Sequence, residues 1–401
     1  RATNPSNRQL KCGVQQPFIG ILDGCVFMKV VFVNVEDHMF LNQRLNLALA
    51  AQEAGFEVVV ASNKSELHTT ISAYGFKYVD TGNKRRGKNI FSQVSSIYRL
   101  YNIFRYEKPD VVHNISIKPV IYGSIAARLS RVPKIVNLVN GLGYVFTEHK
   151  SFKRMSIKIA VIGLYRFALA SKRIKVIFQN PDDRNYFISK KITSINNSHL
   201  ILGSGVDTSL FSPSVKLSAN KKPTVLFFGR MLWDKGIGYL IEAKKILEAE
   251  GIDFTLTLVG EPDESNPSHI NLDQLKKWEI DGFITFLGYC PDMVEIIRAS
   301  DLVVLPTYYR EGVPLSLIEA ASVGKPIVTT DMPGCREIVV DGVNGFLVPV
   351  KDSVALADKI RELLLDKNLR ISFGMKSRER AIKLFAKEIV AKRTIEIYLN
   401  N

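Results

Sequence analysis

The sequence is short of cysteine and of long apolar segments, and both shortages exclude a class of protein. Its four cysteines show neither metal-ligand spacing nor close pairing, which argues against a disulfide-stabilised domain and favours a reducing compartment such as the cytosol. They are Cys12, Cys25, Cys290 and Cys335. No segment reaches the roughly 18 uncharged apolar residues that a membrane-spanning helix needs. We therefore expect a globular protein without a membrane span or a structural metal site.

The glycine-rich dinucleotide fingerprint is also missing. The first clean apolar strand, at residues 29–35, is followed by the turn 36–40, which reads EDHMF and contains no glycine. A G-x-G-x-x-G turn is needed at this place for a backbone to approach a pyrophosphate closely. Its absence disfavours a nicotinamide-dependent dehydrogenase.

Acidic residues are scarce relative to basic ones. The chain has 54 Lys and Arg against 39 Asp and Glu, a formal net charge of +15. Such a charge calls for an anionic partner, which could be a membrane surface, a phosphate-rich substrate or a nucleic acid. Nucleic acid is the least favoured of these because no base-reading motif is recognisable.

The basic residues concentrate at 150–175, a segment with eight Lys or Arg and no acid. Its apolar residues recur at mixed helical spacing, and Lys158 and Arg166 interrupt the run, so the segment cannot span a bilayer. It could lie against an anionic membrane surface, where each cation contributes about 1 kcal/mol. The alternative is an ordinary core helix with a basic, solvated face.

What is present is a regular alternation of short apolar strands and amphipathic helices from residue 28 onward. This alternation predicts α/β architecture with parallel sheets, and 401 residues are enough for two domains with a cleft between them. A polar stretch at 212–223, SPSVKLSANKKP, is typical of a linker near the domain boundary. Residues 1–27 differ from the rest and lack the features of a signal peptide, so we interpret them as a non-native extension.

The rest of the sequence is arranged around residues 301–345. An apolar strand at 302–305 leads through a loop to Pro314, which suits a helix start, and a second strand follows at 327–330. Glu311 lies in the loop and Glu319 in the helix, about 12 Å apart along a helix axis. Two such acids could contact separate parts of one long ligand whose phosphates lie at the helix N-terminus. The alternative is a pair of solvated surface glutamates.

Three more residues stand at the ends of strands, where open α/β sheets bind ligands. Arg230 follows the strand 224–228, and Lys235 precedes the next helix, a natural place to hold a diphosphate. Either could instead be an ordinary surface cation. His113 ends the strand 110–113 and could face a reacting sugar and an acceptor hydroxyl, or it could be a hydrogen-bonded structural histidine.

Together these motifs resemble family 4 of the retaining GT-B glycosyltransferases, over residues 28–401. The second half carries the matching patterns Gly203-Ser-Gly-Val-Asp207, Gly229-Arg230, Lys235-Gly236, Glu311-GVPLSLI-Glu319, Gly324-Lys-Pro-Ile, and Gly334-x-x-Glu337 with Asp341-GVNGFLV. The first half, with Pro109-DVV-His113, Asn140-GLGYV-Phe146 and Phe178-QNPD-Asp183, is similar to a bacterial subgroup that extends lipid-linked oligosaccharides.

The resemblance implies two Rossmann-like domains facing each other across a cleft. It places an acceptor-binding domain at 28–205 and a nucleotide-sugar-binding domain at 206–385. Residues 386–401 would form a helix packing back on the first domain.

The resemblance also assigns roles. Arg230 and Lys235 would bind the donor diphosphate, Glu311 the donor sugar and Glu319 the ribose. The expected donor-site backbone contacts come from Gly312, Val313, Pro314 and Leu315. We expect the catalytic group to comprise Glu311, His113, Arg230 and Lys235. The expected acceptor and membrane side comprises Asn42, Arg44, Lys118, Lys153, Arg154, Lys172 and Arg173.

The function implied is transfer of a hexose or N-acetylhexosamine from a UDP-sugar to a polyprenyl-diphosphate saccharide, with retention and an α-linkage. We expect no cofactor and no metal ion, since two cations could replace one, and a cytoplasmic enzyme held peripherally on an anionic membrane. The alternatives are a UDP-sugar epimerase or a phosphorylase of the same fold, or a non-catalytic basic membrane-binding module.

Overall fold

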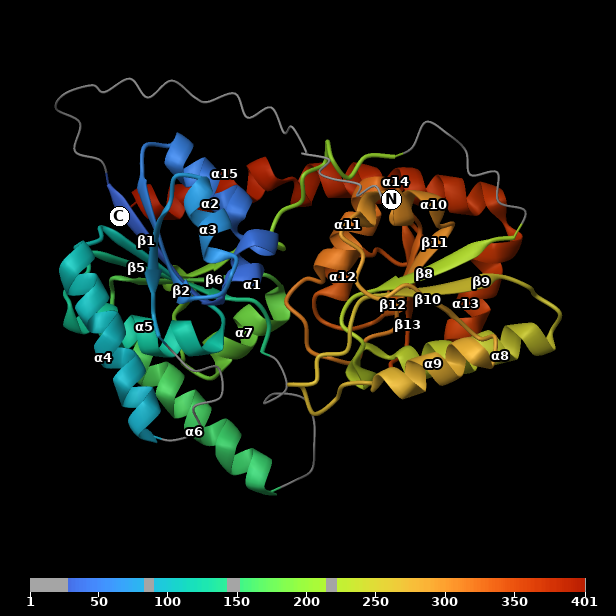
Figure 1. Ribbon diagram of the computed structural model, residues 1–401, viewed down its shortest axis with the longest axis horizontal. Helices are drawn as coiled ribbons and strands as arrows, with labels where there is room; N and C mark the ends of the chain where they lie inside the picture. Colours follow the sequence, from blue (N-terminus) through green and yellow to red (C-terminus); the bar gives the residue numbers. More distant parts are fainter. Residues whose placement is uncertain (1–27, 83–89, 143–151, 214–221, 401) are drawn as a thin grey trace, which may run out of the picture.

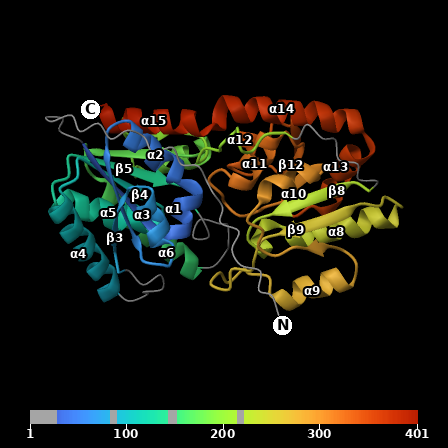
Figure 2. The same cartoon turned by 45° about the horizontal axis from the view of Figure 1, so that its top comes forward.

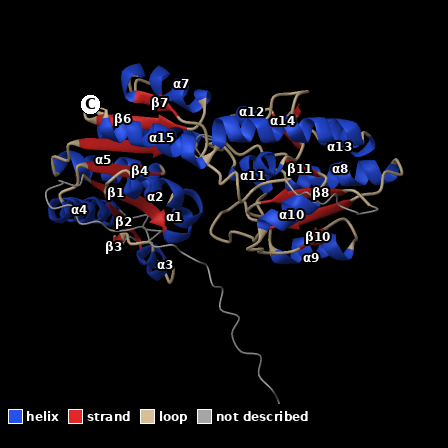
Figure 3. Cartoon of the chain, turned by 90° about the horizontal axis from the view of Figure 1, so that it is seen from above, coloured by secondary structure: helices blue, strands red, loops and turns tan. Residues whose placement is uncertain are grey.

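A computed structural model describes residues 28–82, 90–142, 152–213 and 222–400. The chain forms two α/β units, each a parallel sheet with helices on both faces, placed side by side (Figure 1). Seen from above, the two sheets occupy separate halves of the molecule (Figure 3). The prediction of two parallel α/β domains is confirmed. The interpretation of residues 1–27 lies outside the described residues, and the predicted domain limits stay predictions.

The first sheet has seven parallel strands in the order β3-β2-β1-β4-β5-β6-β7. They are β1 (Lys29–Glu36), β2 (Glu57–Asn63), β3 (Lys77–Asp80), β4 (Val111–Ile115), β5 (Lys134–Val139), β6 (Ile174–Phe178) and β7 (Ser198–Leu200). Its helices are α1 (Asp37–Gln43), α2 (Leu45–Glu53), α3 (His68–Ala73), α4 (Ile90–Glu107), α5 (Ile117–Leu129), α6 (Phe152–Leu169) and α7 (Pro181–Ser189), with a 3₁₀ turn at Ile195–Asn197. Chain order reverses direction between β1 and β4, which makes this pair the switch point of the sheet.

The second sheet has six parallel strands in the order β10-β9-β8-β11-β12-β13, with its switch point between β8 and β11. They are β8 (Thr224–Phe228), β9 (Thr255–Val259), β10 (Thr285–Phe286), β11 (Leu302–Leu305), β12 (Ile327–Thr330) and β13 (Gly345–Val348). Its helices are α8 (Ile237–Ala249), α9 (Leu272–Ile280), α10 (Met293–Ala299), α11 (Leu315–Val323), α12 (Cys335–Ile338), α13 (Ser353–Leu365) and α14 (Lys367–Phe385), with a 3₁₀ turn at Trp233–Lys235.

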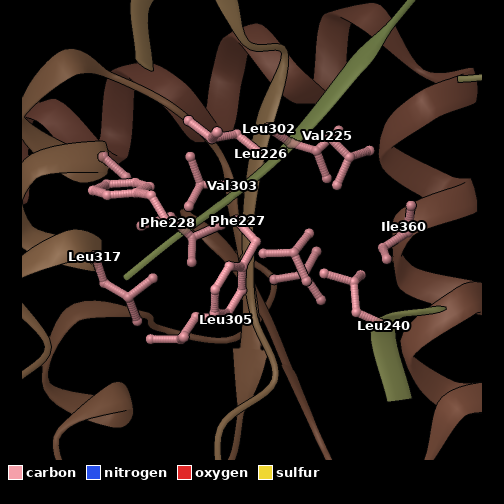
Figure 4. Close-up of a cluster of buried hydrophobic side chains, with 14 of the residues drawn as sticks. Val225, Leu226, Phe227, Phe228, Leu240, Leu302, Val303, Leu305, Leu317 and Ile360 are labelled. Carbon is pink, nitrogen blue, oxygen red and sulfur yellow. The ribbon is translucent and has the colours of Figure 1, made fainter. Parts of the chain in front are cut away.

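Both sheets are buried because helices cover their two faces, as parallel sheets require. On β4 the side chains alternate, so Val112 packs with α4 and α5 while Val111 and Ile115 pack with α2. Figure 4 shows the second core, where Val225 lies on the side of Leu240 of α8 and Ile360 of α13, and Val303 lies on the opposite side of the sheet, toward Leu317 of α11.

The last helix, α15 (Lys387–Leu399), returns to the first domain after the second is complete (Figure 2). It packs on α2, and its Val390, Ala391, Ile397 and Tyr398 belong to the core of the first domain. The returning chain runs beside the outgoing one, since Val206 N–H donates to Phe385 O at 2.8 Å and Lys387 N–H donates to Val206 O at 2.9 Å. Two hydrogen-bonded crossings therefore join the domains.

The expected turn at residues 36–40 is wrong, because helix α1 begins directly after β1. The Asp37 carboxylate fixes this segment. It accepts hydrogen bonds from Ser65 N–H at 3.0 Å, Ser65 Oγ at 2.7 Å and Tyr78 Oη at 3.0 Å. A buried acid held by long-range partners can thus start a helix without a glycine turn.

Candidate functional site

The centre of the site is the loop between β11 and α11, at the switch point of the second sheet. Pro314 is the N-cap residue of α11, in an extended conformation, and the helix begins at Leu315. The preceding loop is tied to the β8 side, because Tyr308 and Tyr309 donate backbone hydrogen bonds to Asp234 O at 3.0 and 3.1 Å. The loop and the turn after β8 are therefore joined by hydrogen bonds into one surface.

Lys235 and Glu311 form an ion pair at this surface. Lys235 is only 8% exposed, and removing one partner of such a buried ion pair is strongly destabilising. Gly236 permits the close approach, since it has φ +81° and a Cβ there would lie 1.9 Å from Pro306 O. The sequence thus predicts two residues that the structure brings into direct contact.

The N-terminus of α11 offers backbone donors next to this pair. The N–H groups of Gly312 and Val313, both buried residues, have no acceptor within the described part of the chain. Unpaired N–H groups together with the positive end of a helix dipole make a binding site for an anion such as phosphate. This arrangement suits the phosphate contacts predicted for residues 312–315.

Glu319 lies one turn into the same helix and is half-buried. Its carboxylate has no hydrogen-bond or ion-pair partner among the described residues, and burial raises its pKa to about 8. An acid in this state can accept or donate a hydrogen bond to a ligand hydroxyl.

Arg230 occupies the predicted place after β8 but has a partner that the sequence analysis missed. Its Nη1 lies 3.0 Å from Asp263 Oδ2, and its side chain is half exposed. Asp263 follows β9 in the segment Gly260-Glu-Pro-Asp263, and this strand-end position was the signal that could have indicated it.

The first domain holds the Glu311 loop from the other side. Asn180, the N-cap residue of α7, donates from Nδ2 to Gly312 O at 3.1 Å, and Arg310 Nε lies 3.2 Å from Asp183 Oδ1. Burial raises the pKa of Asp183 to about 6, although Arg310 and Asn180 oppose the shift. The sequence analysis gave Asn180 and Asp183 no role, because they contact the Glu311 loop only when the two domains pack together.

The backbones of the two domains also pack closely where the Glu311 loop meets the first domain. A Cβ on Gly312 would lie 2.6 Å from Asn140 O, and a Cβ on Gly141 would lie 2.5 Å from Gly312 N. Both glycines are therefore required where the two domains meet.

His113 is not at the ligand-binding rim, which contradicts the expectation that it faces a sugar. Its side chain is 0% exposed, stacks on Phe32 and hydrogen-bonds through Nδ1 to Tyr398 Oη of α15. Burial lowers its pKa to about 3, so it remains neutral. This placement fits the alternative that His113 is a hydrogen-bonded structural histidine.

Arg44 is likewise turned inward, contrary to its predicted acceptor-side position. It is 2% exposed, its Nη1 donates to Gln43 O at 3.1 Å, and burial lowers its pKa to about 10. It lies at the break between α1 and α2, where α15 covers it. Asn42, by contrast, is exposed on α1.

The remaining basic residues of the acceptor and membrane side are spread over three elements. Lys118 is exposed in the first turn of α5, and Lys172 is exposed after α6. Arg173 donates to Val132 O at 2.8 Å and so has a structural contact. Lys153 and Arg154 lie in α6, whose side chains are described from residue 155 onward.

No helix in the described ranges is long and apolar enough to cross a membrane. The same residues contain no cluster of three or more His, Cys, Asp or Glu that could hold a metal ion.

Comparison with known proteins identifies two families. Residues 29–180 match the family Glycosyl transferase 4-like, and residues 211–380 match Glycosyl transferases group 1. The N,N'-diacetylbacillosaminyl-diphospho-undecaprenol alpha-1,3-N-acetylgalactosaminyltransferase of Campylobacter jejuni is 26% identical over 382 residues, covering 92% of this chain and 98% of the relative. The UDP-Gal:alpha-D-GlcNAc-diphosphoundecaprenol alpha-1,3-galactosyltransferase of Escherichia coli is 29% identical over 300 residues, covering 71% and 74%.

Solved structures share the fold. The sucrose-phosphate synthase of Thermosynechococcus elongatus superposes with a TM-score of 0.77 at 20% identity, covering 92% of this chain and 98% of that one. Anabaena HepE, solved in complex with UDP and glucose, gives a TM-score of 0.74 at 20% identity, covering 93% and 100%.

Proposed function

The chain belongs to the glycosyltransferases, with a 4-like first domain and a group 1 second domain, and from this premise we propose that it is a retaining, UDP-sugar-dependent hexosyltransferase acting on a lipid-linked saccharide. The predictions of the GT-B fold and of a transferase are confirmed. Because both halves match enzyme families, the non-catalytic alternative is set aside.

The donor site is proposed at the β11–α11 loop. Lys235 and Arg230 would hold the diphosphate together with the free N–H groups of Gly312 and Val313, while Glu311 contacts the sugar and Glu319 the ribose. The observation that carries this proposal is the buried Lys235–Glu311 pair placed directly before the open N-terminus of α11. It supports the proposal because positive charge and a carboxylate that could accept hydrogen bonds from sugar hydroxyls lie side by side.

The reaction requires little covalent chemistry from the protein. The bond between the anomeric carbon and the β-phosphate oxygen breaks, and an acceptor hydroxyl oxygen bonds to that carbon on the same face. The hydroxyl proton passes to an oxygen of the departing UDP, so the products are UDP and an α-glycoside. Lys235, Arg230 and the helix N-terminus stabilise the negative charge that develops on the leaving group.

The acceptor class is proposed from the relatives' names. The Campylobacter jejuni and Escherichia coli relatives are named for diphospho-undecaprenol saccharides and for alpha-1,3 transfer. We infer that this chain extends a polyprenyl-diphosphate saccharide by a hexose or N-acetylhexosamine.

Because such an acceptor sits in a membrane, we propose that the enzyme works peripherally on the cytoplasmic leaflet. The exposed apolar side chains of α6, such as Ile159 at 63% exposure, together with the basic residues of 150–175, would contact anionic lipid.

The decisive experiment measures UDP release from a panel of UDP-hexoses, with and without a polyprenyl-diphosphate sugar. Lys235→Ala should lower kcat/KM by about a hundredfold or more, since hydrogen bonds to a buried charge are worth roughly 1.5–3 kcal/mol and Glu311 loses its partner as well. Lys276→Ala, an exposed lysine on α9, is the matched control and should behave as wild type.

Two further measurements separate the alternatives. A phosphorylase would need inorganic phosphate, and an epimerase would convert the donor without releasing UDP.

With Lys235 and Arg230 in the place of a metal ion, we expect EDTA to leave the rate unchanged. UDP bound away from Lys235, Arg230 and Glu319 in a crystal would contradict the proposed donor site.

A further inference from the structure

A cavity of about 210 Å³ lies in the first domain, at the carboxyl ends of β1 and β2 and beside the first turns of α4 and α5. At about 30 Å³ per water molecule it has room for roughly seven waters, about the size of one sugar ring. It includes the end of β1 and the start of α5, which follows β4, so it lies at the switch point of the first sheet. Open α/β sheets bind their ligands at this point.

Polar and positively charged side chains line part of this switch-point cavity, beside apolar ones such as Val33, Leu100 and Pro119. Amide and hydroxyl groups come from Asn34, Asn63, Gln93 and Ser96, and no carboxylate is found among the described residues that surround it. Asn34 is 5% exposed, and its Nδ2 has no acceptor within the described part of the chain. A buried amide left without a partner costs about 1–3 kcal/mol, which a ligand hydroxyl or phosphate oxygen would recover.

Two cations complete the lining. Arg99 comes from the third turn of α4 and donates to Gly82 O, and Lys118 comes from the first turn of α5. Both residues are exposed to solvent. With two positive charges, several neutral hydrogen-bonding groups and no acid, the lining fits a hydroxylated ligand that carries phosphate.

The switch-point cavity is linked to the donor loop by a short series of contacts. Lys118 and Pro119 of the cavity directly follow Ser116 and Ile117 in the chain, and Asn140 Nδ2 lies 3.4 Å from Ser116 Oγ. Asn140 O in turn packs against Gly312, where a Cβ would lie 2.6 Å away. The carboxyl edge of the first sheet thus leads directly to the loop that carries Glu311.

We propose that this switch-point cavity binds the phosphate-linked sugar of the acceptor, with Arg99 and Lys118 on the diphosphate and the amide groups on the sugar ring. This inference rests on the proposed function, since it assigns the subsite for the second substrate of that reaction. It also replaces the predicted acceptor residue Arg44, which is buried under α15, with Arg99.

The test uses the full chain and a soluble probe, N-acetylglucosamine joined through a diphosphate to farnesol. Arg99→Gln and Lys118→Gln should each raise the Kd of the probe by about tenfold in calorimetry, because each removes one charge-assisted contact to phosphate. The Kd of UDP should not change in either variant. Arg105→Gln, an exposed arginine on the same helix outside the cavity, should bind the probe as wild type.

Two additional arms identify the ligand. Gln93→Ala should weaken the probe but not inorganic pyrophosphate, because the amide contacts the sugar. The proposal is overturned if the Arg99→Gln, Lys118→Gln double variant binds the probe as wild type does, or if pyrophosphate alone binds as tightly as the probe. Both substituted cations are exposed, and unchanged circular dichroism and UDP binding verify that the variants are folded. Failure of wild type to bind UDP would instead contradict the proposed function.

Discussion

At the scale of single residues, Glu319 combines a proposed ribose-binding position with an energetic cost. It is half-buried, it has no partner among the described residues, and its pKa is raised to about 8. When the pKa of an acid is higher in the folded than in the unfolded state, the protein loses stability as the pH rises from the unfolded-state pKa to the folded-state pKa. The folded protein therefore carries unfavourable charge above pH 8 unless a ligand satisfies this carboxylate.

We predict that Glu319→Gln stabilises the protein at alkaline pH and weakens nucleotide binding. At pH 8 and above the variant should gain roughly 1–3 kcal/mol in free energy of unfolding, and the gain should vanish below about pH 4.5, where wild-type Glu319 is protonated in both states. Denaturant titrations at both pH values measure this, and Glu53→Gln at an exposed position of α2 is the control. A variant less stable than wild type at pH 8 would contradict it.

The Asp183–Arg310 pair predicts a pH dependence for the proposed donor loop. Its pKa is raised to about 6, and it must be ionised to pair with Arg310, the residue before Glu311. The KM for the UDP-sugar should therefore rise as pH falls below about 6, since protonation weakens this pair. Asp183→Asn should show a raised KM that no longer varies over this range.

Steady-state kinetics from pH 5 to pH 8 tests this prediction. Asp182→Asn is the matched control, because Asp182 is the neighbouring acid and lies 3.7 Å from a different partner, Arg336. An Asp183→Asn variant that retains the wild-type pH profile would exclude the Asp183–Arg310 pair as the titrating element.

At the scale of elements, the Glu311 loop belongs to one domain but is packed against the other. Gly312 lies where a Cβ would meet Gln179 Oε1 at 2.2 Å and the Asn140 carbonyl at 2.6 Å, both in the first domain. The backbone carbonyl cannot move as a flexible side chain can. A change in the conformation of the Glu311 loop therefore requires a shift of the first-domain backbone at the domain junction.

We predict that Gly312→Ala lowers turnover at least tenfold while leaving thermal unfolding of the cores nearly unchanged. The added methyl group would push the domains apart at a cost of about 1–3 kcal/mol. Gly163→Ala in α6, where a Cβ meets nothing within 4 Å, should be neutral. Wild-type turnover in Gly312→Ala would show that this close packing is not needed for catalysis.

Whether the sequence predicted an element or a site residue correctly depended on the length of the element and on how far apart in the sequence the contacting residues lie. The buried strands 29–35, 224–228, 302–305 and 327–330 were predicted within one residue of their bounds, whereas three-residue β7 and six-residue α3 were not predicted, since short segments hold too little pattern. Lys235 and Glu311 were found because strand-end spacing brings them together. His113 and Arg44 were misplaced because the helix that covers them, α15, lies more than 270 residues further along the chain.

At the scale of the whole molecule, the excess of positive charge is concentrated where α6 presents apolar side chains to solvent. Met155, Ile159 and Phe167 are all exposed, and 150–175 has eight basic residues without an acid. Charge and exposed apolar area on one segment together favour an anionic lipid surface.

We predict that Lys172→Glu combined with Ile159→Ser weakens binding to vesicles containing anionic lipid by at least about tenfold, since each nearby cation contributes about 1 kcal/mol. Sedimentation with vesicles at low and high salt measures this. Lys276→Glu on α9 carries the same charge change on the second domain and should bind as wild type. Unchanged vesicle binding in the double variant, or loss of self-association instead, would contradict the membrane role.

The return of α15 to the first domain also governs the order in which the molecule is completed as it is made. At about 5–20 residues per second, the ribosome needs roughly 10–35 s for the stretch 224–398. Until then the first domain lacks Tyr398, so His113 has no hydrogen-bond partner and α2 is uncovered. The half of the protein that is translated first is thus the half that closes last, and it exposes apolar surface to chaperones throughout that interval.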